Sequence, residues 1–287
     1  MRDLHGHLVN ALAGVRGDFA WVVEDPATGV RSTNQPNVPF PGASTLKVAV
    51  LVRLLQLAES GTIHLDACLR LREWHKCGGA GVLQYFANDT MLRVDDLTTL
   101  MIVLSDNTAT NLLLDLTGCA PASATIGDGR SAIRRYYGKP AMSLPDDQPY
   151  TALVTAEGLA SVFRSVLGGS LLSSRSRDHF WRVLSRQQDR ALIPRFLDDS
   201  VRVAHKTGAI DGVRHDAGVI WVPANTSQPH DPMSTRGLDV PVGRPIIVVA
   251  LSRGLDDRSW SVENEGEVAI GRLARAAFDW FATDLGT

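Results

Sequence analysis

Strand-like segments stand at both ends of this chain, and a helical stretch of roughly 150 residues separates them. Strand patterns occur before that stretch, at residues 18–24 and 30–33, and after it, at residues 202–207, 216–222 and 245–252. The last segment is nearly all apolar, which favours a central strand. Five such strands can form one antiparallel sheet only if the two ends of the chain meet. Helices placed between groups of strands therefore predict an α+β fold.

The predicted sheet needs helical cover on both faces. Terminal helices at residues 4–15 and 263–284 are expected to cover one face, and the helical middle the other. We predict a single domain, residues 1–287, in which residues 1–43 and about 198–287 form the α/β part and about 44–197 the helical part. Helices of the middle are predicted at residues 44–59, 94–104, 108–116, 131–136, 155–167, 176–185 and 190–197, and a turn at 208–212.

Composition excludes several classes of function. The 287 residues carry a net charge of −2 with no basic block, so no nucleic-acid partner is expected. No apolar run reaches the roughly 18 residues that a membrane span needs, so no membrane partner is expected. The first residues lack the pattern of a signal peptide. The chain as given is predicted to be cytoplasmic, or periplasmic or secreted if a leader was trimmed from it. Its oligomeric state stays open.

Cysteine usage argues against a disulfide framework, because there are three cysteines, an odd number. Cys68 and Cys77, with His64 and His75, could be imagined as a zinc site. Their spacing fits no compact ligand pattern, and buried thiols with surface histidines are the simpler interpretation. We therefore predict no metal and no cofactor.

The helix predicted from residue 44 begins with a serine and a lysine three residues apart. Residues at this spacing face the same way on a helix, so the Lys47 amine can approach the Ser44 hydroxyl. A serine hydroxyl is a weak nucleophile until a base takes its proton, and a desolvated lysine can be that base. Alternatively, Ser44 caps the helix and Lys47 is solvated.

A second polar group interrupts two apolar helices at Ser105-Asp106-Asn107. Asp106 or Asn107 could simply cap the following helix. Alternatively, the turn projects Ser105 and Asn107 into a cleft.

Three motifs that occur in a fixed order indicate that these residues act together in one site. They are Ser44-x-x-Lys47 opening a helix, Ser105-Asp106-Asn107 between two helices, and Lys206-Thr207-Gly208 ending a strand. With this set, the chain resembles the class A β-lactamases and transpeptidase-like serine hydrolases, including penicillin-binding proteins, along nearly its whole length. The fold of that family agrees with the predicted α+β arrangement.

The resemblance implies catalytic roles. Ser44 would be the nucleophile and Lys47 its base or proton relay. Ser105 would carry a proton to the leaving group, and Lys206 would bias that transfer. The backbone N–H groups of Ser44 and Ala209 would form the oxyanion hole.

The resemblance also implies a small-molecule substrate that carries a carboxylate. Asn107 would hold the substrate amide, and Thr207-Gly208 would line the site. Thr207 and Arg214 would bind the carboxylate, for which arginine is well shaped. Arg214 could equally be a surface arginine on an edge strand.

The chain departs from the family in its long loop. Class A β-lactamases carry Glu-x-x-x-Asn there, and the glutamate activates the water that releases the acyl group. An alignment without gaps places Lys139 and Ser143 at these positions. A lysine ammonium has no acceptor for a proton. Asp146 and Asp147 could substitute, or could be solvated loop carboxylates.

Three functions remain open at this point. The first is a serine hydrolase with an acyl-enzyme, class A β-lactamase-like, whose β-lactam turnover is weak. The second is an intracellular amidase, esterase, peptidase or acyltransferase of the same fold. The third is a non-catalytic relative that keeps the pocket for binding.

Overall fold

The computed structural model describes residues 3–134, 136–138, 150–223 and 243–283. Its centre is a five-stranded antiparallel sheet in the order β2-β1-β10-β9-β8. The strands are β1 (Asp18–Glu24), β2 (Arg31–Asn34), β8 (Arg202–Ile210), β9 (Val213–Val222) and β10 (Arg244–Arg253). Val22 pairs with Val249 and Thr207 with Asp216, so the two ends of the chain share one sheet. The predicted α+β fold and the central place of the apolar strand are confirmed.

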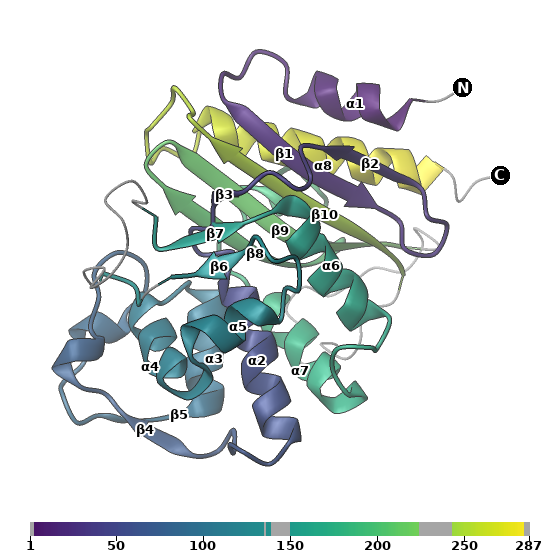
Figure 1. The fold of residues 1–287 in the computed structure, drawn as a ribbon. Coiled ribbons are helices and arrows are strands. Elements are labelled where there is room, and N and C mark those ends of the chain that lie inside the picture. The colour runs from purple at the N-terminus through teal and green to yellow at the C-terminus, as the bar shows by residue number, and fades with distance from the viewer. Residues whose placement is uncertain (1–2, 135, 139–149, 224–242, 284–287) are drawn as a thin grey trace.

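The two faces of the sheet bury alternate residues of each strand, as the period of two requires. On β1, Ala20 and Val22 pack toward the helical part. Trp21 and Val23 pack toward α1 (Leu4–Ala11) and α8 (Glu265–Thr283). Figure 1 shows these two helices on one side of the sheet and the helical part on the other. Each face thus has its own hydrophobic core.

The helical part is built around α2 (Lys47–Glu59), of whose 13 residues 9 are buried. Its other helices are α3 (Val94–Val103), α4 (Asn107–Thr117), α5 (Cys119–Ala124), α6 (Ala156–Leu167) and α7 (Ser174–Leu184), with 3₁₀ turns at Glu73–His75, Leu83–Tyr85 and Ile193–Phe196. Short strands complete it: β3 (Phe40–Pro41) pairs with β7 (Ala152–Val154), β7 with β6 (Ala132–Ile133), and β4 (Cys68–Arg70) with β5 (Met91–Arg93).

Three local predictions were wrong. Within the predicted helix at 131–136, residues 132 and 133 form strand β6 instead, because they pair with the distant β7, with Ala132 opposite Leu153. The predicted turn at 208–212 shortens to Asp211 and Gly212, because β8 continues its ladder against β9 through Ile210. The predicted helix at 190–197 is a single 3₁₀ turn. In each case tertiary pairing or packing outweighs local propensity.

Candidate active site

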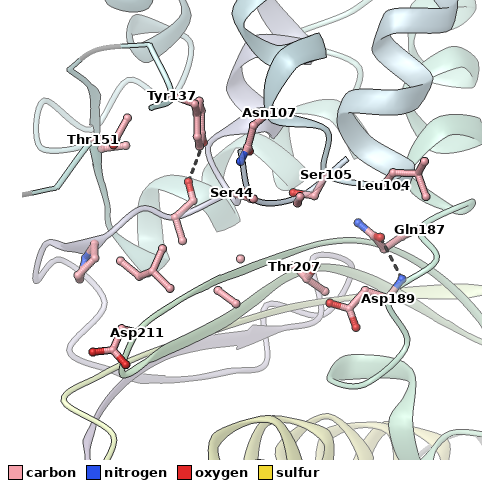
Figure 2. A pocket seen from close by; sticks show the side chains of 18 of the residues that line it. Ser44, Leu104, Ser105, Asn107, Tyr137, Thr151, Gln187, Asp189, Thr207 and Asp211 are labelled. Atoms are coloured by element: carbon pink, nitrogen blue, oxygen red, sulfur yellow. Dashed lines mark hydrogen bonds between the residues drawn. The ribbon is translucent and has the colours of Figure 1, made fainter. Parts of the chain in front are cut away.

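The three motifs meet at one pocket between β8 and the helical part. The pocket has a volume of about 820 Å³, and Ser44, Ser105, Asn107, Thr207, Gly208 and Ala209 line it. Figure 2 shows Tyr137, Asn107 and Ser105 on one side of this space and Thr207 on the opposite side. Lys47 and Lys206 are fully buried beside it. The structure therefore brings together all the predicted catalytic residues.

Ser44 lies in a tight turn that connects β3 to α2, and β8 lies close to this turn. Ala43, the residue before it, has a left-handed φ of +44°, which is strained for a residue with a side chain. The imidazole of His215 binds the Pro41 carbonyl oxygen at 2.5 Å and so ties this segment to β9. A Cβ on Gly208 would lie 3.0 Å from the Ser44 nitrogen. Glycine at 208 therefore allows β8 to approach Ser44 closely.

The Lys47 amine is held by the turn between α3 and α4. It donates to the Ser105 carbonyl oxygen at 2.6 Å, to Ser105 Oγ at 3.1 Å and to Asn107 Oδ1 at 2.8 Å. These three acceptors match the three protons of an ammonium group. Desolvation lowers the pKa of Lys47 well below its ordinary value of 10.5, and the charge of Lys206 lowers it further. A lysine in this position loses its proton easily, as a base must.

The turn that holds Lys47 both caps the following helix and projects residues into the pocket, which were the two alternatives that its sequence left open. Asp106 caps α4, because its Oδ1 accepts from the Ala109 backbone N–H at 2.8 Å. Its Oδ2 accepts from the N–H groups of Val82 and Leu83, which anchors the preceding loop. Ser105, with φ +55°, meanwhile lines the pocket together with Asn107. The buried Asp106 fixes the turn, and its neighbours Ser105 and Asn107 face the pocket.

Lys206 lies on β8, at the edge of the sheet. Its amine donates to the Thr207 carbonyl oxygen at 2.8 Å. Desolvation lowers the pKa of Lys206 to about 8, although Asp216 and Asp189 raise it in part. Its charge in turn acts on Lys47. Two buried amines therefore share one small region, and the charge of Lys206 makes the proton of Lys47 easier to remove.

Arg214 does not line this pocket. It is completely buried on β9, which is an inner strand, so it is not a surface arginine on an edge strand. Its guanidinium donates to Glu267 and to the carbonyl oxygens of Ile210, Val213 and Ser259. The exposed ring of Trp260 covers it at 4.6 Å. These bonds leave little of the guanidinium for a substrate carboxylate.

Tyr137 is the main pocket residue that sequence reasoning missed. Its hydroxyl donates to the Ala43 carbonyl oxygen at 2.8 Å, and the Lys47 amine lies 4.7 Å from the centre of its ring. The only sequence signal was its position in the stretch that leads into the long loop. Lys139, Ser143, Asp146 and Asp147 lie outside the described residues.

The described residues contain no cluster of three or more His, Cys, Asp or Glu side chains suited to a metal ion. Within the same ranges, no helix combines the length and the apolarity needed to cross a membrane.

Comparison with known proteins places the chain in a family. The sequence model of the Beta-lactamase enzyme family matches residues 4–227. Beta-lactamase L2 of Stenotrophomonas maltophilia is 32% identical over 214 residues, which cover 72% of this chain and 69% of that protein. The chain therefore belongs to the Beta-lactamase enzyme family, whose members imply a serine hydrolase of β-lactamase type.

Solved structures agree with this assignment. A β-lactamase from Sphaerobacter thermophilus has a TM-score of 0.80 and 28% identity, with 97% of each chain covered. A structure described as PBP-A has a TM-score of 0.79 and 24% identity, and covers 98% of this chain and 96% of its own. The second likeness supports the fold alone. The family's fold is thus common to proteins described as β-lactamases and to one described as PBP-A.

Proposed function

We propose that this protein is a serine hydrolase that cleaves amide or ester bonds through an acyl-enzyme on Ser44, in the manner of class A β-lactamases. One observation carries the proposal. The buried Lys47, whose pKa is lowered, is bonded to Ser105 and Asn107 beside the Ser44 turn, in a pocket of about 820 Å³. A buried lysine held by neutral groups is expensive to keep charged, which suits a residue that exchanges protons.

Acylation would use Lys47 and Ser105 as a proton relay. Neutral Lys47 takes the Ser44 proton while Ser44 Oγ forms a bond to the substrate carbonyl carbon. When the bond from this carbon to the leaving group breaks, the leaving nitrogen or oxygen takes a proton from Ser105 Oγ. Ser105 regains one from Lys47, to which it is hydrogen bonded. The nearby charge of Lys206 favours this return, because it lowers the proton affinity of Lys47.

The oxyanion of the intermediate would lie between the backbone N–H groups of Ser44 and Ala209. The close approach of Gly208 to the Ser44 nitrogen brings these two chain segments together. Fixed backbone donors of this kind stabilise the transition state without having to reorganise.

A carboxylate on the substrate would depend on Thr207 rather than on Arg214. Thr207 lines the pocket, whereas the guanidinium of Arg214 is engaged elsewhere. A β-lactam is one candidate substrate, and another amide, ester or thioester is the alternative.

The test is a time course of intact-protein mass after mixing with a penicillin, a cephalosporin and an activated ester. We expect a covalent adduct on the wild type and none on Ser44→Ala. Ser60→Ala is a matched control, because Ser60 is exposed at the other end of α2. If Ser44→Ala forms the same adduct as the wild type, the assignment of the nucleophile is wrong.

A further inference from the structure

Trp260 is the most exposed of the six tryptophans in the chain, and it lines the pocket. It is 70% exposed, whereas four of the others are buried, with at most 9% of their surface exposed. A large apolar side chain that stays exposed on the wall of a cavity is typical of a binding surface. The position of Trp260 therefore needs an explanation in terms of a ligand.

The backbone beside Trp260 is held from two sides. The Ser259 carbonyl oxygen accepts from the Arg214 guanidinium at 2.5 Å and from Asn264 Nδ2 at 3.0 Å. Both donors are fully buried. The Ser259 N–H donates to Asp257 Oδ1 at 2.9 Å. The loop before α8 therefore presents Trp260 from a fixed position.

Arg214 also supports the indole ring itself. Its guanidinium carbon lies 4.6 Å from the centre of the ring, where a cation is attracted to the face of an aromatic system. The guanidinium is fixed there, because it also donates to Glu267 and to the Ile210 carbonyl oxygen. One face of the ring is thus covered, and the exposed remainder is available to a ligand in the pocket.

The contacts of Arg214 place the indole at one end of the pocket. The same guanidinium reaches the Ile210 carbonyl oxygen and the Trp260 ring, so the ring lies beside the end of β8. Asp211, the next residue, marks this end in Figure 2, and Leu104 lies at the opposite end. The two ends of the pocket therefore differ, and the aromatic ring is at the end of Asp211.

The two halves of a substrate would occupy different ends. In the proposed mechanism the leaving group takes its proton from Ser105, the chain neighbour of Leu104, so it lies toward the Leu104 end. The acyl group, bound to the Ser44 oxygen, would then extend along β8 toward the end where Trp260 lies.

We infer that Trp260 determines the acyl specificity of this protein, and that it selects substrates whose acyl group ends in a planar aromatic ring. The ring of the substrate stacks on the free part of the indole. Aromatic pairs attract each other more than their buried area alone requires, so a flat ring is preferred to an aliphatic ring of similar size. The inference rests on the proposed function, which it deepens by naming the class of acyl group.

The experiment compares thioesters that share one small leaving group, methyl thioglycolate, and differ only in the acyl group. Phenylpropanoyl and cyclohexylpropanoyl thioesters carry rings of similar size, one planar and one puckered. Intact-protein mass gives the second-order rate of adduct formation on Ser44 for each thioester. The quantity compared between proteins is the ratio of the phenyl rate to the cyclohexyl rate.

Four proteins are compared: wild type, Trp260→Leu, Trp260→Phe and Trp74→Leu. Trp260→Leu removes the aromatic plane but keeps an apolar side chain, and Trp260→Phe retains an aromatic ring. Trp74→Leu is the matched control. Trp74 is also an exposed tryptophan, with its ring against His75, but it lies outside the set of described residues that line the pocket.

We expect the wild-type ratio to favour the phenyl thioester by about threefold to tenfold. The ratio should fall at least about threefold in Trp260→Leu, remain intermediate in Trp260→Phe and stay within about twofold of wild type in Trp74→Leu. A second series carries an acetyl group and varies the thiol, phenylethyl against cyclohexylethyl. Its ratio should be the same in wild type and Trp260→Leu, because the indole lies at the acyl end.

Three results would overturn the inference while leaving the proposed function standing, since the adduct on Ser44 still forms in each. One is an equal ratio in wild type and Trp260→Leu. Another is the same loss of ratio in Trp74→Leu. The third is a loss that appears only in the series that varies the thiol. If no adduct forms on the wild type, it is the proposed function that fails.

A binding measurement tests the aromatic platform without catalysis. Saturation-transfer NMR compares phenylpropanamide with cyclohexylpropanamide on Ser44→Ala and on the double variant that also carries Trp260→Leu. Stronger transfer to the phenyl amide, lost with the indole, supports the stacking role even where no thioester reacts. Equal transfer in the two proteins would contradict it.

Discussion

The buried lysines beside the pocket and the buried Arg214 on β9 have opposite kinds of surroundings. Beside the pocket, Lys47 and Lys206 contact hydroxyl, amide and carbonyl oxygens, and within the described residues neither forms an ion pair with a carboxylate. On the far side of β9, Arg214 has Glu267 and three carbonyl oxygens around it. The pKa values of Lys47 and Lys206 are lowered. Arg214, in contrast, has a carboxylate and three carbonyl oxygens as hydrogen-bond partners.

This difference distinguishes lysines suited to proton transfer from an arginine that stabilises the fold. A buried cation without a carboxylate in direct contact is costly, and the cost favours losing a proton. A buried cation with a complete set of partners adds to stability only as long as all the partners remain. We therefore expect substitutions of the lysines to change the rate of acylation, and substitution of Arg214 to change the stability of the fold.

The largest effect is expected at Lys47. Lys47→Met keeps the length of the side chain and removes the base, so the rate of adduct formation on Ser44 should fall by about 10²–10⁴. Stopped-flow kinetics or intact mass with an activated ester measures this rate. Lys76→Met is the control, since Lys76 pairs with Glu73 outside the pocket. A Lys47→Met enzyme acylated within tenfold of the wild-type rate would contradict the role as base.

Arg214→Met should lower the free energy of unfolding by about 3–5 kcal/mol, because it leaves Glu267 and the carbonyl oxygens without their partner. Urea denaturation measures the loss. Arg258→Met, which breaks an exposed pair with Asp211, should cost less than about 1 kcal/mol. The ratio of acylation rates for esters with and without a carboxylate should not change in Arg214→Met. A selective loss for the carboxylate ester would restore Arg214 as a substrate ligand.

His215 links the two regions, because it lies next to Arg214 and binds the Pro41 carbonyl oxygen, three residues before Ser44. Burial lowers the pKa of His215 from 6.5 to about 4. Between these values the unfolded chain binds a proton that the folded chain does not, so stability falls as the pH falls from 6.5 toward 4. The loss from this residue is about 3 kcal/mol. His215→Gln should lose less stability than the wild type over that range in urea titrations at several pH values.

The smallest effect is expected from Lys206→Arg, as a change in the shape of the pH profile. The pKa of Lys206 is about 8, so its charge is lost as the pH rises through this value. If the charged form supports acylation, the wild-type rate should fall about tenfold between pH 7 and pH 9, in proportion to the charged fraction of Lys206. Arginine remains charged there, so Lys206→Arg should show no such fall. The same decline in both proteins would assign it to another group.

The architecture followed from sequence patterns because sheets and helices impose strict periods. The alternation on β1 and the nearly continuous apolar run of β10 predict which strand is central and that both faces are covered. Short elements were predicted less well. The pairing of Ala132 with Leu153 joins residues that are far apart in the sequence, and no local pattern announces it.

The residues of the candidate site also divide into those that local spacing predicts and those that tertiary contacts place. Ser44, Lys47 and the turn at Ser105 and Asn107 were predicted because their spacing places them at the start of one helix and between two others. Arg214 was predicted from a motif on a strand, where side chains alternate between faces, and the structure directs it away from the pocket. Tyr137 carried no motif, since its importance comes from the hydrogen bonds that Asn111 makes to it.

By itself, the sequence predicted which segments form the central sheet, the closeness of Ser44 and Lys47, and the order of the three motifs, because these features depend on short-range spacing. Only the tertiary structure decided which side chains face the pocket. Arg214 turns toward Glu267, a partner 53 residues away in the chain, and Tyr137 covers Lys47 because Asn111 holds its backbone in place. The candidate catalytic pair Ser44 and Lys47 follows from local sequence, and the position of Tyr137 beside this pair follows from packing.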